Sequence, residues 1–173
     1  MNIKYKCRYI SPVGYLSIIS DGKSITKIGI SKESKHIAEY VDSDFHDFEV
    51  LRKTKYWLDC YFSGVKPDFD IPLELCGTVF QKMVWELVSN IPYGRVETYG
   101  EIAKKIAAAR GIKKMSSQAV GGAVGRNPIP IIVPCHRVVG AGGNLTGYGC
   151  GLDVKYRLLE IEGFDMSKFY MPV

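Results

Sequence analysis

The sequence predicts an α+β fold in two parts: a small N-terminal antiparallel sheet with one helix, then a mainly helical domain with a winged helix-turn-helix-like motif. Near the N-terminus, apolar and polar residues alternate with a period of two, which is typical of half-buried strands. After residue 77 the apolar residues recur every three or four positions, behind residues that cap helices. A proline-containing stretch at 64–72 separates the two patterns, so we predict domains at 1–76 and 77–173.

The N-terminal domain is predicted to contain three strands and one helix. Basic residues alternate with aromatic and cysteine residues at the start, which indicates a strand with one polar and one apolar face. Ser20–Lys23 has the composition of a hairpin turn. The polar segment 31–47 receives no assignment. The predicted elements are strands at 4–10, 15–19 and 24–30 and a helix at 48–62 that stops at Gly64.

The C-terminal domain is predicted to contain four helices. Thr78-x-x-Gln81 and Thr98-x-x-Glu101 are capping boxes that begin the first two, and Ser116 is expected to cap the third. The fourth is expected at 152–162, before Gly163. The residues expected to be buried on the first helix are Phe80, Val84, Leu87 and Val88, and those on the second are Ile102 and Ile106.

Composition narrows the functional classes. The chain has 173 residues, 46% of them hydrophobic, and a net charge of +5, which permits a polyanionic partner without requiring one. No apolar run is long enough to cross a membrane, and the N-terminus lacks the apolar core of a secretory signal. The five cysteines are widely spaced and form no C-x-x-C pair, so we expect neither a disulfide framework nor a metal site. A reducing cytoplasm is the expected location.

The segment Ile131–Val139 is the strongest candidate for chemistry. Apolar strand-formers flank Pro134-Cys135-His136-Arg137, which predicts buried backbone on both sides of a rigid turn. The turn presents a thiol beside an imidazole and a guanidinium, and nearby cationic donors favour the reactive thiolate. No helix N-terminus is predicted at Cys135. A buried structural cysteine is the alternative interpretation.

The second and third helices of this domain suggest a helix-turn-helix, although any pair of antiparallel helices would have the same pattern. Gly121 and Gly122 lie inside the third helix, where each costs about 1 kcal/mol relative to alanine. Ala119, Gly122 and Ala123 form a face of small side chains. Such a face permits close backbone approach, either to another protein element or to a nucleic-acid groove.

Two further features lie near the C-terminus. The glycine-rich stretch Gly140–Gly149 lacks the pattern of a phosphate cradle, and a loop around a flat ligand near Tyr148 fits it as well. Glu162 falls at the C-terminal end of the last helix, where the helix dipole disfavours a carboxylate. A cationic partner would explain its position, and simple surface exposure is the alternative.

The segment Asn127–Val138 closely resembles the active-site signature of the O6-alkylguanine-DNA alkyltransferases, and the similarity extends from about Thr78 to Gly163. The resemblance implies a helix-turn-helix that binds double-stranded DNA through its minor groove and a damaged guanine flipped into a pocket. It further implies that Cys135 accepts the alkyl group and that His136, acting through a water, deprotonates it. In the same pattern Glu162 orients the histidine and Asn127 braces the turn.

The resemblance also assigns residues that contact the substrate. Tyr99, at the start of a capped helix, is expected to meet a phosphate and the base. Main-chain groups of Cys135, Val138 and Gly149 are expected to bond the guanine edge, and Tyr148 to form a pocket wall. Arg137 is expected to brace the site. The DNA-contacting residues implied on and after the third helix are Gln118, Ala119, Gly122, Ala123 and Arg126.

This chain departs from the family at Gln118, where members usually carry an arginine that fills the stack left by the flipped base. Glutamine can hydrogen-bond the orphaned partner base, but it lacks the charge and the cation–π contact of arginine. Either Gln118 fills the stack less strongly, or a neighbour such as Arg110 or Lys114 substitutes for it.

The implied function is DNA repair by one displacement, in which O6-alkylguanine, and also O4-alkylthymine, would transfer its alkyl group to Cys135. Nothing in the sequence suggests a group that cleaves the resulting thioether, so we expect a monomer that is consumed in a single turnover and needs no cofactor or metal. Alternatives are a damage-binding relative without the reactive cysteine, a cysteine hydrolase using Cys135, His136 and Glu162, and a transcription factor. The presence of Cys135 argues against the first of these.

Overall fold

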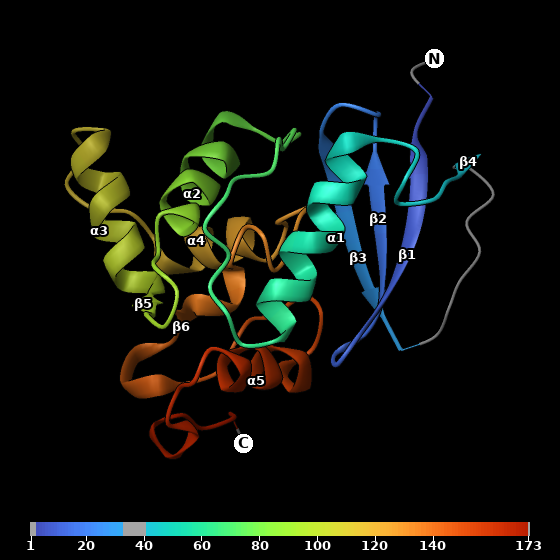
Figure 1. The fold of residues 1–173 in the computed structure, drawn as a ribbon. Coiled ribbons are helices and arrows are strands. Elements are labelled where there is room, and N and C mark those ends of the chain that lie inside the picture. The colour runs from blue at the N-terminus through green and yellow to red at the C-terminus, as the bar shows by residue number, and fades with distance from the viewer. Residues whose placement is uncertain (1–2, 33–40, 173) are drawn as a thin grey trace. The chain divides into compact units, whose positions relative to one another are not determined.

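The computed structural model describes residues 3–32 and 41–172 and divides into two compact units, Met1–Cys76 and Gly77–Val173 (Figure 1). The first unit is a sheet with a helix, and the second is mainly helical. The predicted α+β class, with the sheet before the helices, is therefore confirmed.

The first unit contains a mixed sheet in the order β3-β2-β1-β4. β1 (Tyr5–Ser11), β2 (Gly14–Ser20) and β3 (Ile25–Ser31) are antiparallel, as the alternating pattern and the hairpin turn predict. β4 (Val41–Asp42), which the sequence did not predict, pairs in parallel with β1. The unassigned segment 31–47 includes β4, and residues 33–40 of it lie outside the described part of the chain.

The expected polar face of β1 is wrong at Lys6, which is only 3% exposed, whereas Ile10 is 78% exposed. Lys6 is paired with Ile19 of β2 on one side and with Asp42 of β4 on the other. β1 is therefore an interior strand at this point, and Lys6 is buried on a face that alternation alone predicts to be exposed.

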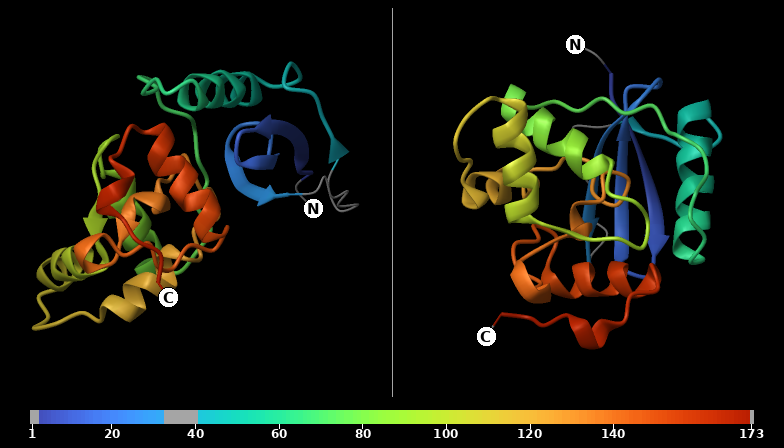
Figure 2. Two further views of the ribbon diagram at one scale, coloured as in Figure 1. Left: turned by 90° about the horizontal axis from the view of Figure 1, so that it is seen from below. Right: turned by 90° about the vertical axis from the view of Figure 1, so that its left-hand side faces the viewer.

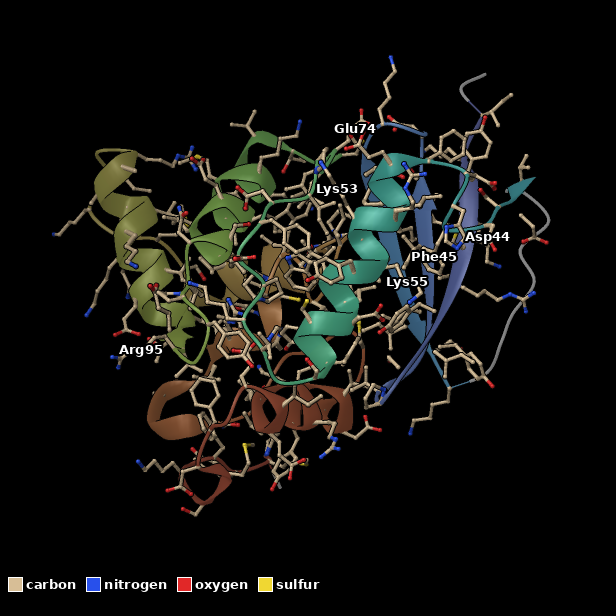
Figure 3. The ribbon with its side chains drawn as sticks, viewed as in Figure 1. Asp44, Phe45, Lys53, Lys55, Glu74 and Arg95 are labelled. Atoms are coloured by element: carbon tan, nitrogen blue, oxygen red, sulfur yellow. The ribbon has the colours of Figure 1, made fainter. Side chains whose placement is uncertain are left out.

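α1 (Glu49–Phe62) runs alongside this sheet, as the view from below makes plain (Figure 2). Leu51 and Leu58 are fully buried on its inner face. Lys53 and Lys55 lie on opposite sides of the helix (Figure 3). Each is about half exposed and pairs with an acidic side chain one turn away, which contributes little stability. The helix ends before Gly64, whose φ of 80° favours glycine.

The second unit begins its helices where the sequence predicts. α2 (Val79–Ser89) and α3 (Tyr99–Ala109) each start with a complete capping box, and the Ser116 hydroxyl accepts a hydrogen bond from the Ala119 amide at the start of α4 (Ser117–Val124). α5 (Leu152–Ile161) ends before Gly163, which has a φ of 80°. α3 and α4 pack against each other and both contact α2.

The expected buried stripe of α2 is only half right. Val84 and Val88 are buried, but Phe80 and Leu87 are partly exposed and Trp85 is buried instead. The indole Nε1 of Trp85 donates a hydrogen bond of 2.9 Å to the carbonyl of Ala123 in α4. Packing against α4 therefore rotates the buried face of α2 away from the stripe that periodicity alone predicts.

Short elements complete the second unit. β5 (Glu97–Thr98) pairs in parallel with β6 (Val138–Val139), and the 3₁₀ helix η1 (Cys135–Arg137) immediately precedes β6. Cys135 therefore opens a short helix, which the sequence did not predict. The 3₁₀ helices η2 (Ala141–Gly143) and η3 (Met166–Lys168) lie in the glycine-rich loop and in the C-terminal segment.

Candidate active site

The turn that carries Cys135 is tightly constrained by its own backbone. Ile131 is fully buried and has a φ of 77°, a conformation that a β-branched residue rarely adopts. The Val133 amide donates to the Ile129 carbonyl at 3.0 Å, and the Cys135 amide donates to the Val133 carbonyl at 2.8 Å. Because the surrounding contacts overdetermine this strained path, the thiol is held in one place.

Asn127 ties the end of α4 to this turn through three hydrogen bonds. Its Oδ1 accepts from the Ile129 amide at 3.0 Å, and its Nδ2 donates to the Val133 carbonyl at 2.8 Å and to the Cys135 sulfur at 3.1 Å. A hydrogen bond donated to sulfur favours the thiolate over the thiol. Asn127 therefore both positions the sulfur and stabilises its charged form.

Cys135 rests as a thiol. It is only 5% exposed, and burial raises the pKa of its thiol. The hydrogen bond from Asn127, the nearby Tyr148 hydroxyl and the charge of Lys155 act in the opposite direction but do not cancel the effect of burial. The reaction that this cysteine supports must therefore include removal of its proton by a base.

His136 and Glu162 form a buried pair, with Nε2 of the imidazole 2.6 Å from Oε1 of the carboxylate and neither side chain exposed. Burial lowers the pKa of His136, although its hydrogen bond to Glu162 acts against this, so the imidazole is neutral near pH 7. An ionised carboxylate can only accept, so Nε2 carries the proton and Nδ1 carries the basic lone pair. The pair has the chemistry of an oriented general base.

Arg137 holds the carboxylate of Glu162 in place. Its Nε lies 3.1 Å and 3.0 Å from the two carboxylate oxygens, and its Nη1 donates to the Ile91 carbonyl at 2.7 Å. The Gly94 amide donates to the same carboxylate at 3.1 Å. Burial raises the pKa of Glu162, but His136 and Arg137 together lower it to about 2. This geometry agrees with a bracing role for Arg137. Arg137 is also a cationic partner that explains why a carboxylate lies at the C-terminal end of α5.

Lys155 is a part of the site that the sequence analysis missed. It is fully buried, and its Nζ donates to the Val138 carbonyl at 2.6 Å and to the Thr146 carbonyl at 2.9 Å. Burial lowers the pKa of Lys155 to about 8, with the Cys135 sulfur acting in the opposite direction. The sequence did contain a signal that Lys155 is buried. Lys155 precedes the apolar Leu158 and Leu159 by three and four residues, and residues at these spacings share one helix face.

Tyr99 begins α3, where it was predicted to meet a phosphate, and its side chain points inward. It is 9% exposed, and its hydroxyl points to the Thr146 and Gly147 carbonyls, at 3.0 Å and 3.2 Å. The Nζ of Lys155 lies 5.8 Å from the centre of its ring and 6.0 Å from that of Tyr148. The two tyrosines, Lys155 and the Thr146–Gly147 backbone thus form one cluster next to the cysteine.

The remaining predicted residues divide into two groups. The Val138 carbonyl accepts a hydrogen bond from Lys155. Gly149 lies so close to the Gly125 carbonyl that an added Cβ would stand 3.2 Å from it. On α4, Ala123 is only 3% exposed and packs toward Trp85, so the predicted DNA contact at Ala123 does not fit its burial. The predicted contacts that remain exposed on or just after α4 are Gln118, Ala119, Gly122 and Arg126.

Comparison with known proteins identifies the family of the chain. Residues 79–164 match the DNA-binding domain of 6-O-methylguanine DNA methyltransferase, and residues 4–75 match the ribonuclease-like domain of the same protein. The chain belongs to this methyltransferase family. The resemblance inferred from Asn127–Val138 is therefore confirmed, and it extends to the N-terminal unit as well.

Individual relatives of the family cover almost the whole chain. A methylated-DNA–protein-cysteine methyltransferase of Methanosarcina acetivorans is 45% identical over 92% of this chain and 98% of its own length. One from Haemophilus influenzae is 42% identical over 94% of this chain and 88% of its own. A Mycobacterium tuberculosis protein solved as a complex with DNA has a TM-score of 0.78 at 38% identity, covering 95% of this chain and 94% of that one.

The described residues, 3–32 and 41–172, also bear on membrane and metal binding. None of the helices there is both long and apolar enough to span a membrane. In the same residues no three histidine, cysteine or acidic side chains are grouped as metal ligands.

Proposed function

We propose that this chain is a methylated-DNA–protein-cysteine methyltransferase that repairs O6-alkylguanine in double-stranded DNA by accepting the alkyl group on Cys135. The observation that carries the proposal is the arrangement around this thiol: Asn127 bonds the sulfur at 3.1 Å, and the neighbouring imidazole of His136 is paired at 2.6 Å with Glu162. Membership of the family and the DNA complex of a relative supply the substrate class.

In the proposed reaction His136 takes the proton of Cys135, through a water, and becomes an imidazolium. Glu162 is ionised and stabilises that cation, while Arg137 keeps the carboxylate in position. The sulfur then attacks the carbon attached to O6, a carbon–sulfur bond forms as the carbon–oxygen bond breaks, and guanine leaves with the electron pair. Lys155, whose charge lowers the pKa of Cys135, stabilises the thiolate before the attack.

We further propose that the damaged base reaches Cys135 by flipping out of the duplex, which costs a few kcal/mol. The pocket would be formed by Tyr148 and by main-chain groups of Val138 and Gly149. The Val138 carbonyl already accepts a hydrogen bond from Lys155, and a carbonyl oxygen has a second lone pair with which to bond a guanine edge. O4-alkylthymine presents a similar O-alkyl group and belongs to the same proposal. Tyr99 supports the pocket from behind rather than binding a phosphate.

The proposed DNA surface is the exposed side of α4, with Gln118, Ala119 and Gly122, followed by Arg126. A Cβ added to Gly122 would meet only the flexible end of Arg126, at 3.5 Å, so packing within the protein does not demand glycine there. The close approach of an external partner, such as the minor groove of DNA, explains a glycine at this position better than packing within the protein does. Ala123 is left out because it is buried.

We expect each molecule of the protein to be consumed by a single transfer. A thioether on Cys135 is stable, so each molecule should accept one alkyl group. We also expect a monomeric protein and no cofactor. The two predicted domains would divide the work, with 77–173 binding DNA and accepting the alkyl group and 1–76 supporting it. The five cysteines are free, which fits a reducing compartment such as the cytoplasm.

The test is an intact-mass measurement after incubation with a duplex carrying O6-methylguanine. Transfer adds about 14 mass units to the peptide that contains Cys135, because a methyl group replaces the thiol proton. Cys135→Ala should bind the same duplex without gaining mass. Lesion binding by the native protein without a mass increase would instead indicate a damage-binding function, and hydrolysis of an ester substrate that requires Cys135 would indicate a cysteine hydrolase.

The role of Gln118 is tested separately by Gln118→Arg. If Gln118 fills the space of the flipped base, an arginine there should tighten binding to lesion DNA or speed transfer, because it adds a charge and a stacking plane. Binding is measured at a fixed salt concentration, since every added phosphate contact steepens the salt dependence. Unchanged affinity and rate would place the stacking residue elsewhere, and Arg110→Ala and Lys114→Ala would then identify it.

A further inference from the structure

The turn that follows α2 reaches the proposed general base from a distant part of the chain. The Arg95 amide donates to the Pro92 carbonyl at 3.1 Å and closes a four-residue turn, 92–95. Gly94, its third residue, has a φ of 72°, whereas the φ of Tyr93 is negative. This combination is characteristic of a type II turn, in which the third residue is usually glycine.

The type of this turn decides where the Gly94 amide points. Types I and II differ mainly by a flip of the central peptide, which here joins Tyr93 to Gly94. In the observed turn this peptide directs the Gly94 N–H to Oε2 of Glu162, at 3.1 Å, across 68 positions of sequence. A type I turn would keep the bond between Arg95 and Pro92 but would turn this N–H away from the carboxylate.

Other groups of the same segment hold the neighbours of this carboxylate. The Ile91 carbonyl accepts a hydrogen bond from Nη1 of Arg137 at 2.7 Å. The Tyr93 hydroxyl donates to the carbonyl of Ile161, the residue before Glu162, at 3.3 Å. The ring of Tyr93 also lies 5.6 Å from the guanidinium carbon of Arg137. The segment therefore contacts both members of the buried ion pair of Arg137 and Glu162.

The two carboxylate oxygens of Glu162 have different partners. Oε1 lies 2.6 Å from Nε2 of His136, whereas Oε2 accepts from the Gly94 amide at 3.1 Å. The Nε of Arg137 lies almost equally far from both oxygens, at 3.1 Å and 3.0 Å. The last torsion of a glutamate side chain has a broad energy minimum, so donors at both oxygens are needed to fix the plane of the carboxylate. Gly94 supplies a donor at the oxygen that His136 does not use.

We propose that the 92–95 turn is a positioning element of the alkyl transfer, in which the Gly94 amide holds Oε2 of Glu162 so that Oε1 stays aligned with His136. The inference rests on the proposed function of His136 as the base that deprotonates Cys135. A misaligned carboxylate stabilises the imidazolium less, because a hydrogen bond weakens steeply as its geometry departs from linear. His136 then becomes a weaker base and removes the thiol proton more slowly. Gly94 thus acts through Glu162 and not on the substrate.

Gly94→Val tests the proposal, with Gly111→Val as the matched control. The φ angles of the two glycines are 72° and 63°, and a Cβ at either would meet nothing within 4 Å. A β-branched residue rarely adopts a positive φ, so Gly94→Val should convert the turn to type I and withdraw the amide from Glu162. Gly111→Val imposes the same strain just after α3. Gly94→Asn should keep the native turn, because asparagine tolerates a positive φ.

The first measurement needs no DNA and is therefore independent of the transfer reaction. The proton on Nε2 of His136 is followed by nuclear magnetic resonance of the full-length protein near pH 7, and it is identified by its loss in His136→Gln. In Gly94→Val we expect this resonance to move upfield and the proton to exchange faster with water. In Gly111→Val and Gly94→Asn it should stay as in the native protein. An unaltered Nε2 proton in folded Gly94→Val would overturn the proposal.

The second measurement is the rate of alkyl transfer against pH, with a saturating duplex that carries O6-methylguanine. Burial lowers the pKa of His136, Glu162 raises it, and Arg137 and Lys155 lower it. Gly94→Val weakens the contribution of Glu162, so the fall of the rate on the acid side should move to lower pH. The plateau rate should drop by about tenfold, because the base is weaker.

The control decides whether these changes are specific to the base. Gly111→Val and Gly94→Asn should keep the native midpoint of the acid side, since neither alters the contact with Glu162. The same midpoint and plateau in Gly94→Val as in Gly111→Val would mean that the turn is only structural, and would overturn the proposal. Absence of transfer by the native protein would instead refute the proposed function, and the Nε2 proton of His136 would then decide the positioning by itself.

Discussion

At the scale of single residues, Asn127 has more influence on the reactive sulfur than its size suggests. One amide group satisfies the Ile129 amide, the Val133 carbonyl and the Cys135 sulfur. We expect Asn127→Ala to lower the free energy of unfolding by about 2 kcal/mol, since two buried backbone groups lose their partner. We also expect alkyl transfer to slow by about tenfold, because the thiolate loses a donor. Single-turnover kinetics and urea unfolding measure the two effects.

Asn127→Asp is the control that separates position from charge. Aspartate keeps the acceptor for the Ile129 amide but cannot donate to sulfur when ionised, and its negative charge would raise the pKa of Cys135 further. Transfer by Asn127→Asp should therefore be slower than transfer by Asn127→Ala at the same pH. Equal rates in all three proteins would mean that the hydrogen bond at 3.1 Å has no part in activating the thiol.

Lys155 is a second residue whose charge can be separated from its packing. Lys155→Met keeps most of the buried volume and removes the ammonium that bonds the Val138 and Thr146 carbonyls. We expect the pKa of Cys135 to rise and transfer to slow by at least about tenfold, because the thiolate loses its nearby cation. Titration of thiol reactivity against pH, with a small alkylating reagent, should show the shift directly. Lys155→Arg, which keeps a charge, should lose less activity if the fold accommodates it.

At the scale of elements, the C-terminal segment supports the loop that contacts Tyr99. The Leu145 amide donates to the Tyr170 carbonyl at 2.8 Å, and the Tyr170 amide donates to the Gly143 carbonyl at 3.1 Å. Leu145 belongs to a small buried cluster with Val139 and Leu159, which Phe164 and other side chains cover. The C-terminal segment of the chain therefore holds in place the loop that begins with η2.

Two adjacent glycines of this loop allow a matched test. Gly142 and Gly143 have φ angles of 68° and 89°, so alanine is strained by about 1 kcal/mol or more at either position. A Cβ at Gly142 would meet nothing within 4 Å, whereas one at Gly143 would stand 2.2 Å from the Lys168 carbonyl. We expect Gly143→Ala to cost about 2 kcal/mol more than Gly142→Ala, because the C-terminal segment must move. Equal melting temperatures would show that the segment is not held against the loop.

The elements also show what can and cannot be predicted from sequence. Helix starts were predictable because a cap such as Thr78 bonds a backbone amide three residues away. The burial of Trp85 was not, because it depends on the carbonyl of Ala123, 38 residues further along the chain. β4 was missed for the same reason: two residues carry too little pattern, and only pairing with β1 makes them a strand. The reactive turn was recognised by its residues, but the inward orientation of Tyr99 required the loop at Thr146 and Gly147.

At the scale of the whole molecule, the two units carry one tryptophan each, which makes their unfolding separable. Trp57 belongs to α1 in the first unit, and Trp85 is 1% exposed in the second. In a Trp57→Phe background, fluorescence therefore reports on the unit that contains the active site. Free energies of unfolding obtained this way refer to one cooperative unit, which a signal from the whole chain does not guarantee.

The buried pair of Glu162 and His136 should give this unit a characteristic dependence on pH. The pKa of Glu162 is about 2 in the folded protein, below its ordinary 4.5, so between these values the unfolded chain binds a proton that the folded one does not. The ionised carboxylate therefore raises the free energy of unfolding by roughly 3 kcal/mol at most. This stabilisation is fully present above about pH 4.5 and is lost as the pH falls toward 2. The pKa of His136 is also lowered in the folded protein, so the free energy of unfolding already begins to decline as the pH falls through the ordinary pKa of 6.5.

Glu162→Gln should remove the part of this decline that lies below about pH 4.5, because glutamine does not titrate. It should also lower stability near pH 7, since Arg137 and His136 lose their buried anion. Glu160→Gln is the control, because Glu160 is an exposed residue of the same helix whose ion pair with Arg157 is in solvent. Urea unfolding in the Trp57→Phe background, from about pH 7 down to about pH 3, measures all three proteins. If Glu162→Gln loses stability with pH as steeply as the parent, the carboxylate is not held ionised by His136 and Arg137, and the general base must be oriented in another way.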